Sequence, residues 1–174
     1  MHQPTMNNVI HAFETAINEL LENCDSLSEV LLNKIPFEHS WTAGQIGDHL
    51  LKSYNSWTLL KSDTGDANRP IDEKCASLSS LFLNFDIKMK AEPSDFNYPS
   101  QAPIEKELLL KNILKTRDEI IGFARHHDLG VLCLAAEFPA FGHLTRLEWL
   151  HFHTVHTLRH LRQLNNCISS LNAA

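Results

Sequence analysis

The chain has few of the features that mark nucleic-acid-binding, secreted or membrane proteins. Its 174 residues carry 15 Lys and Arg against 21 Asp and Glu, a net charge of −6, and the basic residues form no patch interleaved with aromatic side chains. Attraction to phosphate backbones needs such a patch, so we expect no nucleic-acid partner. No apolar run approaches the length that crosses a bilayer, and the first residues lack the pattern of a signal peptide. We therefore expect a cytoplasmic protein without a membrane partner.

Cysteine is also scarce. Cys24, Cys75, Cys133 and Cys167 are scattered without paired spacing, which argues against a disulfide framework and against a thiolate zinc site. With 43% hydrophobic residues and modest numbers of glycine and proline, the chain is long enough to bury a core of its own. We expect a single domain over residues 1–174.

The spacing of apolar residues predicts four long helices. They are expected over residues 5–33, from the capping box Thr42-Ala-Gly-Gln45 to about residue 61, from Pro103 to about Arg125, and after a second capping box, Thr145-Arg-Leu-Glu148. Residues 62–101 are broken by glycine and proline and predict a long connection, with a short helix over residues 78–89. No alternating strand pattern of useful length competes. The sequence predicts an all-α fold, a four-helix bundle with a long crossover between the second and third helices.

The last predicted helix is rich in histidine on one face. His153, His156 and His160 fall within about 60° of one another on a helix, and Trp149 and Gln163 share that face. A buried imidazole needs a hydrogen-bond partner for each ring nitrogen, and a metal ion would supply one. His156 and His160, one turn apart, can both reach one ion. The motif is not that of a zincin, because no glutamate follows the first histidine.

Two candidates remain for a third ligand. His153 lies on the same face of the last helix, and His49 lies on the inward stripe of the second helix; spacing alone favours His153. Each is also explained as a buried histidine that is hydrogen-bonded to a neighbouring helix. Gln163 could orient a ligand or donate to substrate, or it could simply pack. Asp48 could support an imidazole, although its direction puts it off the His49 stripe.

Three segments resemble the DinB-like superfamily of small helical proteins: SWTAGQIGDHLL (40–51), FPAFGHLTRLEW (138–149) and HTVHTLRHLRQL (153–164). The resemblance covers most of the chain and is poor between residues 62 and 101. It implies a four-helix bundle of DinB-like type that binds one divalent metal at one end through His49, His156 and His160. His153 would then be a fourth ligand or a hydrogen-bonding group for bound water. The superfamily is similar to thiol-dependent transferases and a maleylpyruvate isomerase.

Three neutral imidazoles leave a divalent ion with its full charge and an exchangeable position, at which the pKa of bound water or a bound thiol falls. The leading hypothesis is a metal-dependent enzyme acting on a small-molecule substrate, either a hydrolase or a transferase of a low-molecular-weight thiol. Hydrolysis needs a proton acceptor, for which His153 is the nearby candidate. Imidazole suits zinc, nickel, iron and copper alike, and we expect zinc or nickel.

Other functions stay open at this point. A non-catalytic metal-binding module would use the ion to fasten the second helix to the last, and its surface would bind a partner. A helical scaffold without metal is the third possibility, because spacing predicts ligands only in part. The bundle faces of the family also suggest a homodimer.

Overall fold

The computed structural model describes residues 6–87, 89 and 98–173, and this part of the chain is mostly helical. The elements in chain order are α1 (Met6–Asp25), α2 (Glu29–Leu32), α3 (Ala43–Tyr54), the 3-10 helix η1 (Asn55–Lys61), β1 (Thr64–Gly65), α4 (Cys75–Phe82), α5 (Lys106–His126), β2 (Leu132–Cys133) and α6 (Arg146–Asn172). The strands β1 and β2 form a small antiparallel pair. The predicted all-α class is confirmed.

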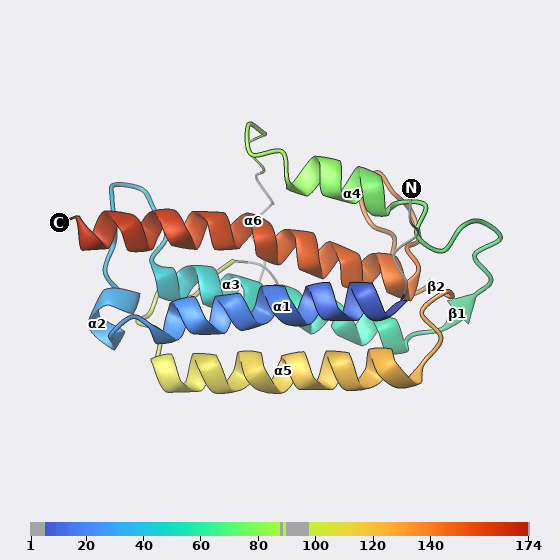
Figure 1. Ribbon diagram of the computed structural model, residues 1–174, viewed down its shortest axis with the longest axis horizontal. Coiled ribbons are helices and arrows are strands. Elements are labelled where there is room, and N and C mark those ends of the chain that lie inside the picture. The colour runs from blue at the N-terminus through green and yellow to red at the C-terminus, as the bar shows by residue number, and fades with distance from the viewer. Residues whose placement is uncertain (1–5, 88, 90–97, 174) are drawn as a thin grey trace.

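The long helices α1, α3, α5 and α6 lie side by side and enclose the core (Figure 1). Both α1 and α3 pack against α5 and α6, and α4 packs against α6. The inward side chains are aliphatic or aromatic and fully buried; they include Phe13, Ile17, Leu20, Ile46, Leu50, Ile113, Ile120, Leu150 and Leu164. Removal of this apolar surface from water is the main favourable contribution to folding.

Both predicted capping boxes are confirmed. The Thr42 hydroxyl accepts from the Gln45 amide at 3.1 Å, and Gln45 Oε1 accepts from the Thr42 amide at 3.1 Å. At the start of α6 the corresponding distances between Thr145 and Glu148 are 3.1 Å and 2.9 Å. These bonds fix where α3 and α6 begin.

The first predicted helix is interrupted. It was expected to reach residue 33, but α1 ends at Asp25 and a separate short helix, α2, follows. The Ser28 hydroxyl accepts from the Leu31 amide at 3.3 Å and so starts α2 as a new helix. A serine that bonds to the backbone in this way favours a cap over a helix interior.

The third predicted helix begins later than expected. Pro103 was the expected start, whereas α5 begins at Lys106. The reason is a tertiary contact: the Asn33 side chain accepts from the Ile104 amide at 2.7 Å and donates to the Ile104 carbonyl at 2.9 Å. These two bonds occupy the backbone of Ile104, which lies just before the helix starts.

The segment between α3 and α5 differs from its prediction in the type and the bounds of its helices. The expected helix up to residue 61 changes from α-helix to 3-10 helix after Tyr54. The short helix expected over residues 78–89 is α4, which begins and ends earlier, at Cys75 and Phe82. Residues 88 and 90–97 of the predicted connection lie outside the described residues.

Candidate metal centre

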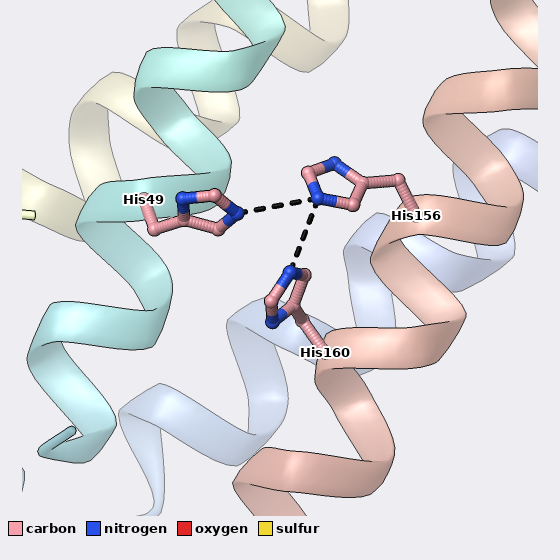
Figure 2. A group of neighbouring side chains, drawn as sticks. All are labelled: His49, His156 and His160. Carbon is pink, nitrogen blue, oxygen red and sulfur yellow. Dashed lines mark hydrogen bonds between the residues drawn. The ribbon is translucent and has the colours of Figure 1, made fainter. Parts of the chain in front are cut away.

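Three histidines from two helices meet between α3 and α6 (Figure 2). His49 comes from α3, and His156 and His160 come from α6. The Nε2 atom of His156 lies 3.2 Å from Nε2 of His49 and 3.1 Å from Nε2 of His160. Each ring offers one ligand atom within 4.8 Å of the others, so this three-histidine group could hold a metal ion.

The separations between these nitrogens suit a common ion. Imidazole nitrogens bind zinc at about 2.0–2.1 Å, so two of them spread by about 90–110° at the ion lie about 2.8–3.4 Å apart. The separations of 3.1 Å and 3.2 Å fall in that range. The donors are three imidazole nitrogens, a set that fits a divalent transition metal. Three protein ligands would leave a position for a small molecule on a four-coordinate ion.

Two of the rings are oriented from behind by polar side chains. Nδ1 of His160 lies 3.0 Å from Oε1 of Gln163, and Nδ1 of His156 lies 3.2 Å from the Ser53 hydroxyl. The sequence suggested an orienting role for Gln163, and the structure places it there. The sequence pattern gives Ser53 no such role. A contact on the outer nitrogen fixes the plane of an imidazole and the nitrogen that it presents to a ligand.

Aromatic rings surround the three-histidine group. Trp41 lies parallel to His160, with ring centroids 6.4 Å apart, and is tilted against His49 at 5.2 Å. Phe152 stacks on His156 with centroids 5.4 Å apart and an interplanar angle of 11°. These rings remove water from the imidazoles, and sequence periodicity assigned none of them to the site. Their contribution depends on packing between helices.

Burial keeps the imidazoles of His156 and His160 neutral. It lowers the pKa of His160 to about 3, with a further lowering from His49. Burial also lowers the pKa of His156 well below its ordinary value, and the neighbouring His160 and His49 rings add to the shift. Because a metal binds the unprotonated ring, both side chains are in the binding form at neutral pH.

His153 lies one turn before His156 on α6 but outside the three-histidine group. Its ring is fully buried, with Nε2 3.4 Å from the Ser56 hydroxyl. Its Nδ1 has no hydrogen-bond partner among the residues that the structure describes. Burial lowers the pKa of His153 to about 4. Spacing favoured His153 over His49 as third ligand, whereas the structure brings His49 to the group, as the family resemblance implies.

Asp48 is directed away from the three-histidine group. Its carboxylate accepts from the Ser100 amide at 2.7 Å and from the Lys52 ammonium at 3.0 Å. It therefore fastens α3 to the chain that precedes α5. The sequence had already placed Asp48 off the His49 stripe, and the contacts agree with that direction.

A cavity of about 460 Å³ lies next to Trp41. Its lining mixes aromatic, aliphatic and polar side chains and includes Trp41, Tyr98, Ile35 and Gln45. Trp41 also contacts His49 and His160, so one indole borders both the cavity and the three-histidine group. A molecule in this cavity would lie within reach of the same indole that covers the ligands.

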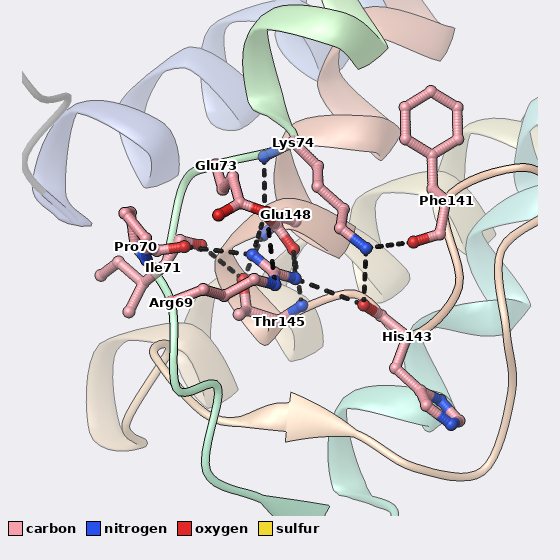
Figure 3. Close-up of polar contacts among 9 residues, drawn as sticks. All are labelled: Arg69, Pro70, Ile71, Glu73, Lys74, Phe141, His143, Thr145 and Glu148. Carbon is pink, nitrogen blue, oxygen red and sulfur yellow. Dashed lines mark hydrogen bonds and ion pairs between the residues drawn. The ribbon is translucent and has the colours of Figure 1, made fainter.

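A second buried polar cluster stands at the start of α6 (Figure 3). The Glu148 carboxylate is fully buried and accepts two bonds of 2.7 Å from the Arg69 guanidinium, one of 2.8 Å from the Lys74 amide and one of 2.9 Å from the Thr145 amide. The bond to Glu148 raises the pKa of Arg69. This Glu148 cluster fastens the connection between α3 and α5 to the first turn of α6.

Across residues 6–87, 89 and 98–173, none of the helices combines the length and the apolar character of a membrane span. A family model for the DinB superfamily matches residues 12–164, which include all three histidines of the group. Searches of curated proteins and of solved structures gave no match. Because the family match extends over most of the 174 residues, the chain belongs to the DinB superfamily.

Proposed function

We propose that the protein is a metal-dependent enzyme that activates a low-molecular-weight thiol or water for reaction with a small-molecule substrate. The single observation that carries the proposal is the convergence of three Nε2 atoms from His49, His156 and His160. A divalent ion held there, zinc or nickel, would supply the positive charge that lowers the pKa of a bound thiol or water. The chain's own residues hold the ligands, exclude water and set the charge of the site.

The electrostatics favour an anionic ligand. The neighbours that shift the pKa of His156 are other histidines and Arg159, and Arg159 also lowers the pKa of His160. Arg159 is held in place because its guanidinium donates to the carbonyls of Phe82 and Asn84 at 2.9 Å and 3.0 Å. Neutral imidazole ligands and the nearby Arg159 would not compensate the positive charge of a bound metal ion. A thiolate or hydroxide is the ligand that such a site attracts most strongly.

Thiol transfer needs fewer catalytic groups from the protein than hydrolysis does. A metal-bound thiol has a low pKa without further help, whereas attack by water needs a proton acceptor. His153 is the candidate acceptor, and its Nε2 is already 3.4 Å from the Ser56 hydroxyl. We therefore place thiol transfer ahead of hydrolysis. The catalytic role of His153 stays a prediction, which a His153→Gln variant tests by its rate with an ester or amide substrate.

The cavity beside Trp41 suggests where the body of a substrate binds. Its lining of aromatic, aliphatic and polar side chains suits a planar, uncharged group. Trp41 is part of this lining and also contacts the rings of His49 and His160. Under the proposal, a Trp41→Ala variant weakens substrate binding, measured as a raised KM, more than it lowers metal content.

The first experiment is elemental analysis of the purified protein, followed by loading with zinc or nickel and a screen of low-molecular-weight thiols against electrophilic acceptors. Consumption of free thiol is the readout. The His156→Ala variant should lose both metal and activity, and His11→Ala, which changes an exposed histidine of α1, should lose neither. Metal binding without turnover on any thiol or ester would favour the non-catalytic metal-binding module. Failure to bind zinc or nickel would refute the metal centre itself.

A further inference from the structure

Gln163 and Ser53, the polar side chains that contact the outer nitrogens of His160 and His156, differ in whether they can donate a hydrogen bond to the ring. Oε1 of Gln163 can only accept, so Nδ1 of His160, 3.0 Å away, carries the ring proton. Nε2 of His160 then always presents a lone pair. The Ser53 hydroxyl, 3.2 Å from Nδ1 of His156, can either donate or accept. The proton of His156 is therefore not fixed by its partner.

Nε2 of His156 occupies the middle of the three-histidine group. It lies 3.1 Å from Nε2 of His160 and 3.2 Å from Nε2 of His49. Because His160 presents a lone pair, a hydrogen bond between His156 and His160 requires the proton to be on Nε2 of His156. The Ser53 hydroxyl then donates to Nδ1 of His156. Both ring nitrogens of His156 then have a hydrogen-bond partner without an ion.

Binding of a cation requires the opposite arrangement. All three Nε2 atoms must then offer lone pairs, so the proton of His156 must be on Nδ1. The Ser53 hydroxyl can accept that proton in a hydrogen bond by rotating its own hydrogen away from the ring. The 3.2 Å separation between Ser53 and Nδ1 serves both arrangements.

We propose that Ser53 is a positioning residue that reverses its hydrogen bond with His156 when a divalent cation binds, while Gln163 holds His160 in one tautomer throughout. His156 loses a proton at Nε2 and gains one at Nδ1, so the number of protons on the ring does not change. The inference rests on the proposed metal centre. It assigns to Ser53 the function of keeping a buried ring nitrogen hydrogen-bonded in both states.

The chain provides a matched control for Ser53. Ser56 lies three residues later, and its hydroxyl is 3.4 Å from Nε2 of His153, which is outside the three-histidine group. The Ser56 hydroxyl donates to the Ser53 carbonyl at 2.8 Å. Ser56→Ala therefore removes the same group from the same part of the fold without removing the partner of a ligand.

The first measurement is nitrogen NMR of the histidine rings in the wild-type protein, without metal and with one equivalent of zinc. We expect the His156 proton on Nε2 without metal and on Nδ1 with zinc, whereas His160 keeps its proton on Nδ1 in both spectra. A His156 proton found on Nδ1 in both states would overturn the reversal. These spectra read the tautomer of each ring directly, and the Ser53 variants then test whether the hydroxyl beside Nδ1 of His156 contributes to binding.

The second measurement is zinc affinity of the variants by competition with a chelator. Ser53→Ala leaves a buried N–H of the loaded ring without a partner and should weaken binding about 5- to 100-fold. Ser53→Thr, which keeps the hydroxyl, and Ser56→Ala should both stay within about 3-fold of wild type. Equal affinities of Ser53→Ala and Ser56→Ala would defeat the inference alone. If the wild-type protein binds no zinc, the proposed metal centre fails and the inference fails with it.

Discussion

Helix α6 contributes to two buried polar clusters that differ in how their polar atoms are paired. In the Glu148 cluster each carboxylate oxygen accepts two hydrogen bonds, and the charge of Glu148 is matched by Arg69 (Figure 3). In the three-histidine group the Nε2 atoms point at one another (Figure 2). The four hydrogen bonds of the first cluster all come from the protein, whereas the second brings together three ring nitrogens that could hold a metal ion. A buried cluster whose hydrogen bonds are all made stabilises the fold. A group of converging ring nitrogens suits the binding of a cation.

The two clusters also differ in how they are supported. Backbone amides at the start of α6 and in the connection supply half of the bonds to Glu148. The histidine rings depend on side chains, with Gln163 behind His160 and Ser53 behind His156. Backbone donors are fixed by the fold itself, while side-chain partners can rotate. This difference leads us to expect stability effects from the first cluster and binding effects from the second.

The largest effect should come from breaking the Glu148 cluster. Glu148→Gln removes the charge that pairs with Arg69 and should lower the free energy of unfolding by about 3–5 kcal/mol, because an unpaired ion is left largely buried. Urea unfolding measures this change. Glu73→Gln is the control, since Glu73 lies 3.9 Å from Arg69 but is half exposed, and it should cost less than about 1 kcal/mol. Equal losses in the two variants would show that the burial of Glu148 adds nothing to the free energy of unfolding.

Acid should destabilise the metal-free protein through its buried histidines. Burial lowers the folded-state pKa of His153 to about 4, below the value of about 6.5 in an unfolded chain. Above pH 6.5 neither state binds the proton and the shift contributes nothing. Between about pH 6.5 and 4 only the unfolded state is protonated, so stability falls with falling pH, by about 3 kcal/mol in total from this residue.

Urea unfolding over that pH range tests the contribution of His153. The His153→Leu variant should lose less stability on acidification than the wild type, with the difference developing between pH 6.5 and 4. His11→Ala, an exposed histidine, should keep the wild-type slope. A wild-type slope in His153→Leu would place the acid sensitivity elsewhere.

Metal binding should be the property that the three-histidine group controls. His156→Ala should weaken zinc binding roughly 100-fold or more, because it removes a ligand rather than a supporting contact. His153→Ala should have a smaller effect, since His153 lies outside the group. Elemental analysis after dialysis against a weak chelator measures the order. The reverse order would overturn the assignment of ligands.

A leucine in place of His156 sharpens the contrast with Glu148. Without metal, His156→Leu should change the free energy of unfolding by less than about 1 kcal/mol or raise it, because an apolar side chain replaces a buried polar one. The urea midpoint of the metal-free variant is the measurement. A loss as large as that of Glu148→Gln would mean that the rings fasten α3 to α6 even without an ion.

The local features of the fold could be predicted from the sequence, and the long-range contacts could not. The capping residues Thr42 and Thr145 are recognised by a partner three residues later, and helical phase alone puts His156 beside His160. His49 depends on how α3 packs against α6, which no spacing within one helix encodes. The family resemblance pointed to His49 because a match to a whole family reflects the packing between helices as well as the pattern within each helix.

The same reason explains what the sequence missed. Arg69 and Glu148 are 79 residues apart, so no local pattern links them. Asn33 displaces the start of α5 through a contact 71 residues away, with Ile104. The strands β1 and β2 are two residues long, too short for any alternation to be visible. Ser53 is a small polar residue on an inward stripe, and only the position of His156 gives it a role.

The smallest effect should come from a site remote from both clusters. Gly122 lies inside α5, and a Cβ there would meet none of the described atoms within 4 Å. Gly122→Ala should raise the free energy of unfolding by about 0.5–1 kcal/mol, because alanine loses less conformational freedom in a helix. Gly47→Ala is the contrasting change, since its Cβ would lie 2.9 Å from Leu109 Cδ2 in the core, and it should give no gain. The zinc affinity of Gly122→Ala should match that of the wild type. A changed affinity would show that metal binding follows overall stability rather than the geometry of the three-histidine group.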